Sequence, residues 1–258
     1  MTEQAKERIK ASPLYSGYVV FVLLAIYTLN FLDRQIVAIL AAPIQTDLGL
    51  SDLQLGLVTG LAFAVFYSIL GLPLAWLADR FNRVRLLSAA CALWSAMTAV
   101  CGFANSFATL FLARIGVGVG EAACVPTSHS IISDYFGPEG RTRALAVFAM
   151  GIPVGTLAGL WIGGVVADAY GWRVAFFILG VPGILLALLA WLTVREPERA
   201  ADAPPAPRLG DAVRQLFAMP AYLRLTFAAA LASLAGYGLV AFLGVYFVRQ
   251  HGDRKSVV

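Results

Sequence analysis

The chain of 258 residues is 60% hydrophobic and only 13% charged, and its mean hydropathy is +0.79. A soluble domain usually carries about a quarter charged residues, so this composition excludes an ordinary soluble protein and indicates one whose solvent is lipid. The net charge of +4 does not indicate nucleic acid, because the Lys and Arg residues lie between apolar runs and form no basic face or arm.

The chain begins with a polar tail, residues 1–16, which we expect to be cytoplasmic. A helix needs roughly 20 apolar residues to cross a bilayer. The run after the tail is too long for a signal peptide and lacks a small-residue cleavage site, so it should remain as a spanning helix. Seven stretches qualify as spanning helices: Gly17–Ala42, Leu55–Ala78, Leu86–Ala104, Phe107–Ile132, Ala144–Ala167, Val174–Val194 and Tyr222–Val248. The sequence therefore predicts an all-α membrane protein in which short connections make consecutive helices antiparallel neighbours.

The connection after the sixth helix differs from the others. Residues 195–219 contain several prolines and alternating charges, which predicts a cytoplasmic linker, with an amphipathic piece at Leu209–Phe217 lying on the membrane surface. The linker separates a six-helix domain, residues 17–194, from one further helix at residues 220–248. The last residues, Asp253–Val258, match one reading frame of a common sequencing adapter. We therefore expect the tail 249–258 to be an artefact and the chain to be truncated.

Basic residues in the short loops predict the orientation. Only Arg173 occupies the loops of one side, where Asp47 and Asp52 also lie. The other side carries Lys6, Arg8, Lys10, Arg80, Arg83, Arg85, Arg141, Arg143, Arg195, Arg199, Arg208 and Arg214. Cytoplasmic loops carry the excess of Lys and Arg. This distribution predicts a multi-pass protein of the cell (inner) membrane with a cytoplasmic N-terminus.

The first three helices resemble the next three. Asp33 and Glu121 each lie in the first helix of a triplet, and the second helices end alike at Asp79 and Asp168, with offsets that differ by one residue. Because three is odd, such a repeat must be inverted in the membrane. Many transporters are built from inverted repeats, with the substrate site at the midplane. A duplication without a transport function is the alternative.

Charged residues interrupt two of the predicted helices. Asp33 and Arg34 lie in the first helix, and Arg114 and Glu121 lie in the fourth. Each of these charges costs about 2.5–3.5 kcal/mol at a helix centre, so all four should face the bundle interior or water. Adjacent residues lie about 100° apart on a helix. We therefore expect one of Asp33 and Arg34 to face the cavity and the other to face a neighbouring helix.

Two motifs resemble those of the major facilitator superfamily. The loop at Gly71–Arg85 reads GLPLAWLADRFNRVR and resembles the signature G-x-L-x-D-R-x-G-R-R, with Ala75 and Asn82 at two glycine positions. The fourth helix reads RIGVGVGE over Arg114–Glu121 and resembles the motif R-x-x-x-G-x-G. The resemblance implies the major facilitator fold, here an N-terminal six-helix bundle of two inverted three-helix repeats plus a seventh helix. It also implies a missing C-terminal half of the same protein as a partner.

The resemblance also implies roles for particular residues. In the family the loop aspartate pairs with arginines and latches one conformation, which assigns Asp79, Arg80 and Arg83 to a latch; a basic anchor without a latch is the alternative. The fifth helix carries glycines at every fourth position, which resemble a glycine-rich family motif and predict close helix packing. They are Gly151, Gly155, Gly159 and Gly163.

Three short segments are similar to the spinster-like branch of the superfamily: Leu29–Arg34, Gly118–Ala122 and Arg195–Arg199. In that branch the first-helix Asp–Arg pair and the fourth-helix Glu are implicated in proton coupling, and lysolipids are among the substrates. The resemblance therefore assigns Asp33, Arg34, Arg114 and Glu121 to proton coupling and substrate binding. Fixed structural pairs are the alternative for Asp33 and Arg34.

The sequence predicts a secondary transporter, driven by protons, that moves an organic anion or amphiphile (a lysolipid-like molecule, a sugar acid or a drug) by alternating access. The expected partners are such a small-molecule or lipid-like substrate, the proton and the lipid bilayer, with no nucleic acid. A seven-helix receptor and a non-transporting membrane scaffold are the alternatives; the cytoplasmic N-terminus argues against the receptor, and the interior charges argue against the scaffold. No motif indicates an enzyme, a catalytic residue or a cofactor, and the cysteine spacing indicates neither a metal site nor a disulfide.

Overall fold

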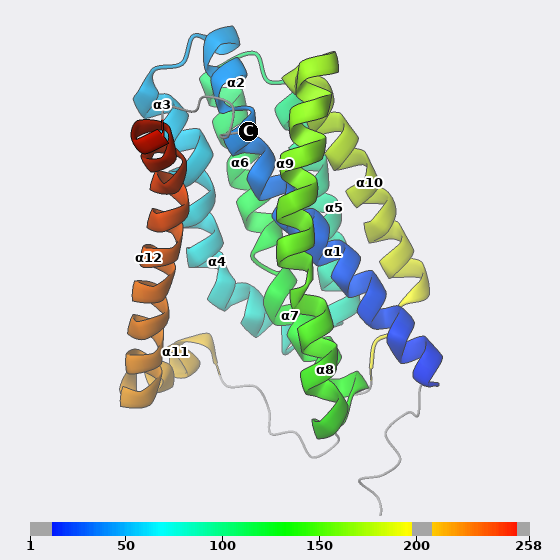
Figure 1. Ribbon diagram of the computed structural model, residues 1–258. Helices are drawn as coiled ribbons and strands as arrows, with labels where there is room; N and C mark the ends of the chain where they lie inside the picture. Colours follow the sequence, from blue (N-terminus) through cyan, green and yellow to red (C-terminus); the bar gives the residue numbers. More distant parts are fainter. Residues whose placement is uncertain (1–11, 198–207, 252–258) are drawn as a thin grey trace, which may run out of the picture. The chain divides into compact units, whose positions relative to one another are not determined.

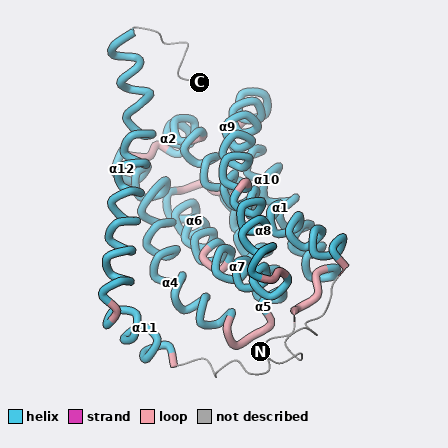
Figure 2. The backbone as a smooth tube through the Cα atoms, turned by 60° about the horizontal axis from the view of Figure 1, so that its bottom comes forward, coloured by secondary structure: helices cyan, strands magenta, loops and turns pink. Residues whose placement is uncertain are grey.

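The computed structural model describes residues 12–197 and 208–251, with side chains described as far as Gly236 apart from that of Leu61. The chain divides into two compact units, Met1–Ala206 and Pro207–Val258. Every regular element in the described ranges is helical (Figure 2). Most of the predicted artefactual tail, residues 252–258, lies outside the described residues.

The first unit contains ten α-helices and one π-helical turn in its described residues (Figure 1). In chain order they are α1 (Pro13–Ile39), α2 (Ala41–Leu48), α3 (Asp52–Gly56), the π-helical turn η2 (Leu57–Leu61), α4 (Ala62–Ala78), α5 (Arg83–Gly102), α6 (Phe107–Glu121), α7 (Cys124–Tyr135), α8 (Pro138–Ala149), α9 (Gly151–Tyr170) and α10 (Trp172–Thr193). Consecutive helices combine into longer spans, so α3 to α4, α6 to α7 and α8 to α9 each make one crossing.

Six spans of this unit are long and apolar enough to cross a membrane: Pro13–Ile39, Asp52–Ala78, Arg83–Gly102, Phe107–Tyr135, Pro138–Tyr170 and Trp172–Thr193. Each contains most of one predicted segment. The first begins at Pro13, inside the segment assigned to the polar tail. The Ser12 hydroxyl accepts a hydrogen bond from the Tyr15 amide at 3.3 Å, and proline suits the first helical position. The α1 helix therefore begins four residues before the predicted spanning stretch, Gly17–Ala42.

The helix contacts follow the predicted inverted repeat. The third helices of the two triplets, α5 and α10, pack on each other. The first helix of each triplet packs on the second helix of the other, so α1 lies beside α9 (Figure 1) and α6 contacts α4. A two-fold axis in the membrane plane exchanges these two pairs of contacts. The first unit is thus the six-helix bundle of two inverted three-helix repeats.

Glycines bring α9 close to α1. A Cβ atom added at Gly151 would lie 3.0 Å from the Tyr27 ring, and one added at Gly159 would lie 3.0 Å from Cβ of Gln35. Gly155 and Gly163 also face α1, so all four glycines of the spaced set are buried on one helix face. Gly164 is different, because no described residue has an atom within 4 Å of the position of its missing Cβ. Small residues at every fourth position therefore allow the two backbones to approach.

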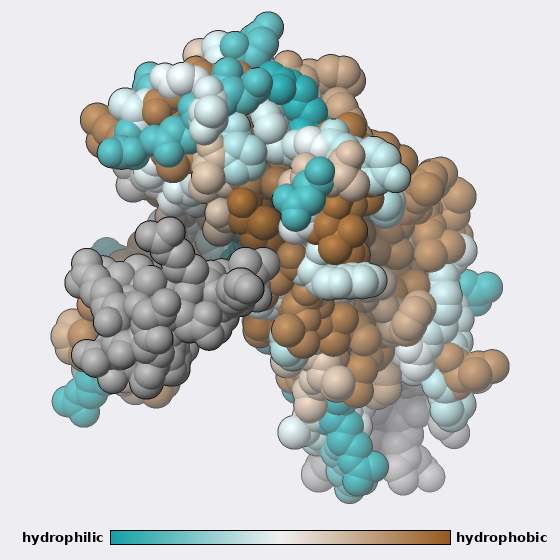
Figure 3. All heavy atoms as spheres, turned by 45° about the horizontal axis from the view of Figure 1, so that its top comes forward, coloured by the Kyte–Doolittle hydropathy of each residue, from teal (hydrophilic) through white to brown (hydrophobic). Residues whose placement is uncertain are grey.

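Large apolar side chains remain exposed along the flanks of the bundle. Trp161 of α9 is 74% exposed and Leu192 of α10 is 70% exposed. Figure 3 shows apolar residues covering the middle of the visible face, with hydrophilic residues gathered toward its ends. A band of this kind is what a hydrocarbon solvent requires.

The second unit consists, in its described residues, of α11 (Leu209–Ala218) and α12 (Pro220–His251). The two helices meet at an angle of 83°. The α11 helix occupies the segment predicted to be amphipathic, and α12 occupies the predicted seventh helix, 220–248. Pro220 begins α12 because proline is tolerated in the first turn, where no helical hydrogen bond is lost.

Candidate functional site

Four ionisable side chains gather in the interior of the bundle, between α1 and α6. Asp33 and Arg114 are each 2% exposed, Glu121 is fully buried, and the Arg34 side chain is 19% exposed. They lie where two apolar core clusters meet. One cluster includes Ile26, Trp94 and Val117, and the other includes Ile36, Cys101 and Leu110. The structure thus brings together all four residues that the sequence assigns to proton coupling and substrate binding.

Arg34 forms an ion pair with Glu121 across the repeat. Its Nε donates to Oε2 of Glu121 at 2.8 Å. Three aromatic rings surround the guanidinium, with centroids 5.0 Å (Phe31), 4.9 Å (Phe63) and 4.6 Å (Tyr67) from its central carbon. Rings at this distance attract a cation, most strongly when it is desolvated. Arg34 is therefore held by one carboxylate and an aromatic box from α1 and α4.

Asp33 points toward a different helix. Its Oδ2 accepts a hydrogen bond from the hydroxyl of Thr98 on α5 at 3.3 Å, and its Oδ1 is buried without a hydrogen-bond partner within the described ranges. Asp33 thus faces a neighbouring helix, and Arg34 keeps partial exposure. The two side chains diverge as the helical rotation of about 100° per residue requires.

Arg114 lies on the same helix as Glu121 and close to both carboxylates. It interacts electrostatically with Asp33 and with Glu121. Its guanidinium carbon is 5.5 Å from the centroid of Phe63, and its buried Nε has no hydrogen-bond partner among residues 12–197 and 208–251. Two cations and two carboxylates therefore share one water-poor volume. Charges in such a volume must be paired, or one of the carboxylates must take up a proton.

Glycines of α6 place this helix against its neighbours. A Cβ atom at Gly120 would lie 2.8 Å from the carbonyl oxygen of Ala90, and one at Gly118 would lie 3.0 Å from that of Phe63. No side chain fits between these backbones. The glycines of the fourth-helix motif thus set the depth at which Glu121 sits, directly before the interruption between α6 and α7.

A second charged cluster lies at one end of the bundle. Arg83, at the start of α5, is 3% exposed and forms ion pairs with Asp134 at the end of α7 and with Glu196 after α10. Its Nε lies 2.7 Å from the Glu196 carboxylate, and one terminal nitrogen donates to the carbonyl oxygen of Pro197 at 2.9 Å. The other oxygen of Glu196 accepts from the Val84 amide at 2.9 Å. Arg83 therefore ties three helix ends together.

Arg173 is the counterpart of Arg83 in the inverted repeat. It lies at the start of α10, pairs with Asp47 near the end of α2 at 2.6 Å, and donates to the Ala104 carbonyl, beyond the end of α5, at 3.1 Å. Each arginine thus bonds to the other triplet at two places. One is an aspartate, Asp134 for Arg83 and Asp47 for Arg173, which lies after or near the end of that triplet's first helix. The other is a backbone carbonyl just beyond that triplet's third helix. The two clusters differ in burial, because the Arg173 and Asp47 side chains are 41% and 46% exposed.

The remaining residues of the predicted latch lie beside this cluster. Asp79 follows the last residue of α4, and the Arg80 guanidinium carbon lies 4.2 Å from the Trp76 ring centroid. Arg83, which the motif groups with them, is engaged by Asp134 and Glu196.

Sequence reasoning missed several residues of these clusters. Thr98, Phe63 and Tyr67 lie on predicted helices, but nothing in their spacing marks them as neighbours of charged groups. Asn30 lies within the Leu29–Arg34 segment but received no role there, although a buried amide in a spanning helix is itself a signal. The described residues contain no group of three or more His, Cys, Asp or Glu side chains that could hold a metal.

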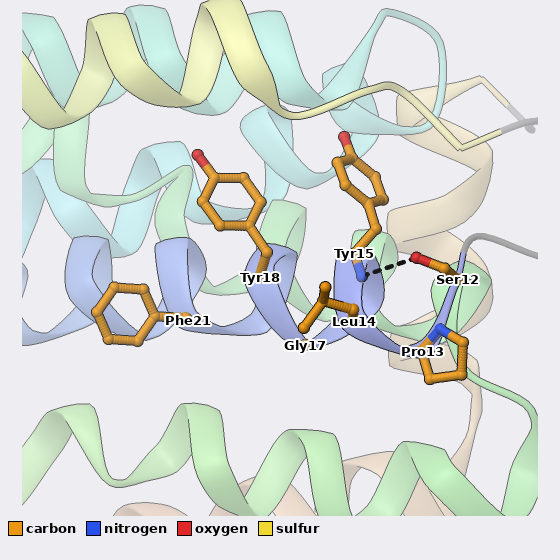
Figure 4. A pocket seen from close by; sticks show the side chains of 7 residues that line it. All are labelled: Ser12, Pro13, Leu14, Tyr15, Gly17, Tyr18 and Phe21. Atoms are coloured by element: carbon orange, nitrogen blue, oxygen red, sulfur yellow. Dashed lines mark hydrogen bonds between the residues drawn. The ribbon is translucent and has the colours of Figure 1, made fainter.

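A shallow hollow of about 780 Å³ lies beside the first turns of α1 (Figure 4). It is lined by Ser12, Pro13, Leu14, Tyr15, Gly17, Tyr18 and Phe21. At 1.5 Å per residue, Phe21 is about 20 Å along the helix from Arg34, so the hollow is separate from the interior charges. The Tyr15 hydroxyl donates a hydrogen bond to the carbonyl oxygen of Thr193, and the Tyr18 hydroxyl is hydrogen-bonded to the Thr193 hydroxyl. These bonds fix the start of α1 to the end of α10.

An inverted-repeat helical bundle with ionisable groups at its centre defines a multi-pass membrane protein built like a secondary transporter. The family model of the Major Facilitator Superfamily matches residues 23–257. A bacterial homologue of the human lysosomal transporter Spinster, solved facing inward, has 38% identity and a TM-score of 0.77, over 94% of this chain and 57% of that one. The chain belongs to the Major Facilitator Superfamily, in its spinster-like branch.

Two curated relatives agree with this assignment. An MFS-type efflux pump of Mycolicibacterium smegmatis is 35% identical over 90% of this chain and 54% of its own length. A sphingosine-1-phosphate transporter of Danio rerio is 31% identical over 88% of this chain and 47% of its own length. The chain thus spans about half the length of the relatives that it matches.

Proposed function

We propose that the protein acts in secondary active transport, coupled to protons, and moves an organic anion or amphiphile by alternating access. The observation that carries this proposal is the ion pair of Arg34 and the fully buried Glu121 at the centre of the bundle. Charges inside a membrane protein are costly and mark ion or substrate pathways. An inert scaffold would gain nothing from placing four of them there.

Glu121 and Asp33 are the proposed proton-binding groups. Burial favours the neutral form of a carboxylate, and a neighbouring arginine favours the charged form. Movement that changes the exposure of the site, or the distance to Arg34 and Arg114, therefore changes how tightly a proton is held. Protonation of Glu121 would break its ion pair with Arg34 and release that cation, which already keeps 19% exposure, for an anionic substrate.

The proposed substrate class follows from the cations and the aromatic rings. Arg34 and Arg114 offer positive charge to an acidic group, while Phe31, Phe63 and Tyr67 offer apolar surface beside it. One of the two curated relatives described above is a transporter of sphingosine-1-phosphate, an acidic amphiphile, and the other is an efflux pump. Lysolipids, sugar acids and amphiphilic drugs are the first compounds to test.

The test is transport by the purified full-length protein in proteoliposomes, measured as substrate-dependent proton movement. We expect Asp33→Asn and Glu121→Gln to insert and fold, yet to lose uphill transport driven by a pH gradient. Arg173→Met, at the exposed cluster, is the control and should keep transport. Full pH-driven accumulation by both neutral variants would refute the assignment of these carboxylates.

The proposed location is the inner membrane, with the N-terminus and the Arg83 end of the bundle in the cytoplasm. The support is the number of basic residues at that end, which carries Arg80, Arg83, Arg85, Arg141 and Arg143, against Arg173 at the other. At the cytoplasmic end we propose that Asp79 and Arg80, with Arg83 beside them, act as a latch that favours one conformation.

A further inference from the structure

The neighbour of the ion pair that has no role so far is Asn30. It lies on α1 one turn before Arg34, so the two side chains share a helix face. Its side chain is completely buried, and neither its amide nitrogen nor its amide oxygen has a hydrogen-bond partner among the described residues. Buried amides are nearly always hydrogen-bonded, so an amide without a partner calls for an explanation.

Glu121 lacks the complementary bond. Its Oε2 accepts from Arg34, but its Oε1 is buried and has no partner in the part of the chain that the structure describes. The Asn30 side chain lies within interaction distance of this carboxylate. A free donor and a free acceptor therefore lie side by side, and only hydrogen-bond geometry is missing. Rotation about the last side-chain torsion of asparagine, which is broad, is enough to bring a donor and an acceptor into line.

We propose that Asn30 is a positioning residue for Glu121: its Nδ2–H donates to Oε1 and holds the carboxylate in the orientation that also meets Arg34. The inference rests on the proposed role of Glu121 as a proton-binding group. The Oδ1 of the same amide can accept a hydrogen bond from the protonated Glu121 carboxyl. Asn30 therefore remains a hydrogen-bond partner of Glu121 after the ion pair with Arg34 is broken. Hydrogen bonds to charged groups are about twice as strong as neutral ones, and Asn30 therefore favours the charged form.

Other titratable and charged groups near Glu121 also affect how tightly it holds a proton. Asp33 lies on α1, Arg114 on α6, Cys91 on α5 and Cys124 on α7, and each interacts electrostatically with Glu121. Tyr67 of α4 contacts Arg34. Asp33 carries no donor when it is ionised, and Arg114 acts as a cation. The thiols of Cys91 and Cys124 are only weak donors, and the Tyr67 ring lies beside Arg34. Asn30 is therefore the neutral amide available to Oε1.

The test measures the protonation of Glu121 directly, by infrared spectroscopy of the purified full-length protein over a range of pH. The band of the protonated Glu121 carboxylic acid is the one that disappears in Glu121→Gln. In Asn30→Leu, which has similar volume and no hydrogen-bonding group, we expect the midpoint of this band to rise by about 0.5–1 pH unit, a three- to tenfold change in proton affinity. In Asn30→Asp, an isosteric change that adds a negative charge, the rise should be larger.

The matched control is Ser88→Ala. Ser88 is also buried, and its hydroxyl also lacks a partner in the described part of the chain, but it lies on α5 near the Arg83 end. Its replacement should leave the midpoint unchanged, which separates a specific effect from a general loss of a buried polar group. Gel filtration and thermal unfolding report whether each variant is folded. If Asn30→Leu is not, Asn30→Ala decides, because it also removes both hydrogen-bonding groups and adds no charge, whereas Asn30→Asp would raise the midpoint through its charge alone.

The outcomes are distinguishable. A midpoint that rises in the Asn30 variants and not in Ser88→Ala supports the positioning role. An unchanged midpoint in a folded Asn30 variant, with the Glu121 band still titrating, overturns the role of Asn30 and leaves the proposed function standing. Absence of a titrating Glu121 band in the unmodified protein overturns both.

Discussion

Replacement of Arg83 tests how much the buried cluster at the end of the bundle stabilises the protein. In Arg83→Met the carboxylates of Asp134 and Glu196, which are 26% and 22% exposed, lose their shared cation. The carbonyl oxygen of Pro197 also loses its donor. Removing one partner of a buried ion pair costs about 3–5 kcal/mol. Because water still reaches both carboxylates in part, we expect a loss near the lower end, about 3 kcal/mol.

The inverted repeat supplies the control. Arg173 occupies the equivalent position and pairs with Asp47, but both side chains are more than 40% exposed. Exposed ion pairs contribute about 0.2–1 kcal/mol. Arg173→Met should therefore destabilise the protein by no more than about 1 kcal/mol, although it removes the same chemical group from the same place in the repeat.

The assay is equilibrium unfolding of the full-length protein in mixed micelles. A triple variant, Arg83→Met with Asp134→Asn and Glu196→Gln, should regain at least half of the loss, because it leaves no uncompensated charge. Equal losses of unfolding free energy in Arg83→Met and Arg173→Met would show that burial does not decide how much each ion pair stabilises the protein. Failure of the triple variant to regain stability would show that the arginine acts by packing and not by its charge.

Three further predictions follow from the helix contacts and the loops. Gly159→Ala should destabilise the protein by about 1–3 kcal/mol because its Cβ would contact α1. Gly164→Ala should stabilise it slightly, because the added Cβ would meet open space and alanine favours a helix. Thermal unfolding shows whether the melting temperature falls in the first variant and rises in the second. Asp79→Asn should insert normally but change the labelling of the cytoplasmic cavity and lower transport; unchanged labelling and transport would leave only an anchoring role. A cysteine at Asp47 should react with an impermeant reagent from outside and one at Asn82 should not; the reverse pattern contradicts the orientation.

The sequence by itself determined which segments span the membrane. A bilayer requires about 20 apolar residues per crossing and penalises charge, so hydropathy alone located all six spans of the first unit and the helix at Pro220–His251. The same penalty predicted that Asp33, Arg34, Arg114 and Glu121 face the interior. The repeat was also visible, because Asp33 and Glu121 lie at matching places in their triplets. Hydropathy did not show that α1 begins at Pro13, because the Ser12 cap is a local hydrogen bond that hydropathy does not report.

Only the tertiary structure decided which charges pair. Asp33 and Arg34 are neighbours in sequence, yet one meets Thr98 on α5 and the other meets Glu121 on α6. Arg83 follows an aspartate in a familiar motif, yet its partners come from α7 and from beyond α10. A pairing of this kind depends on the rotation of each helix about its axis and on the depth at which helices meet. Both are set by side-chain volumes on the facing helices, and those contacts join residues far apart in the chain.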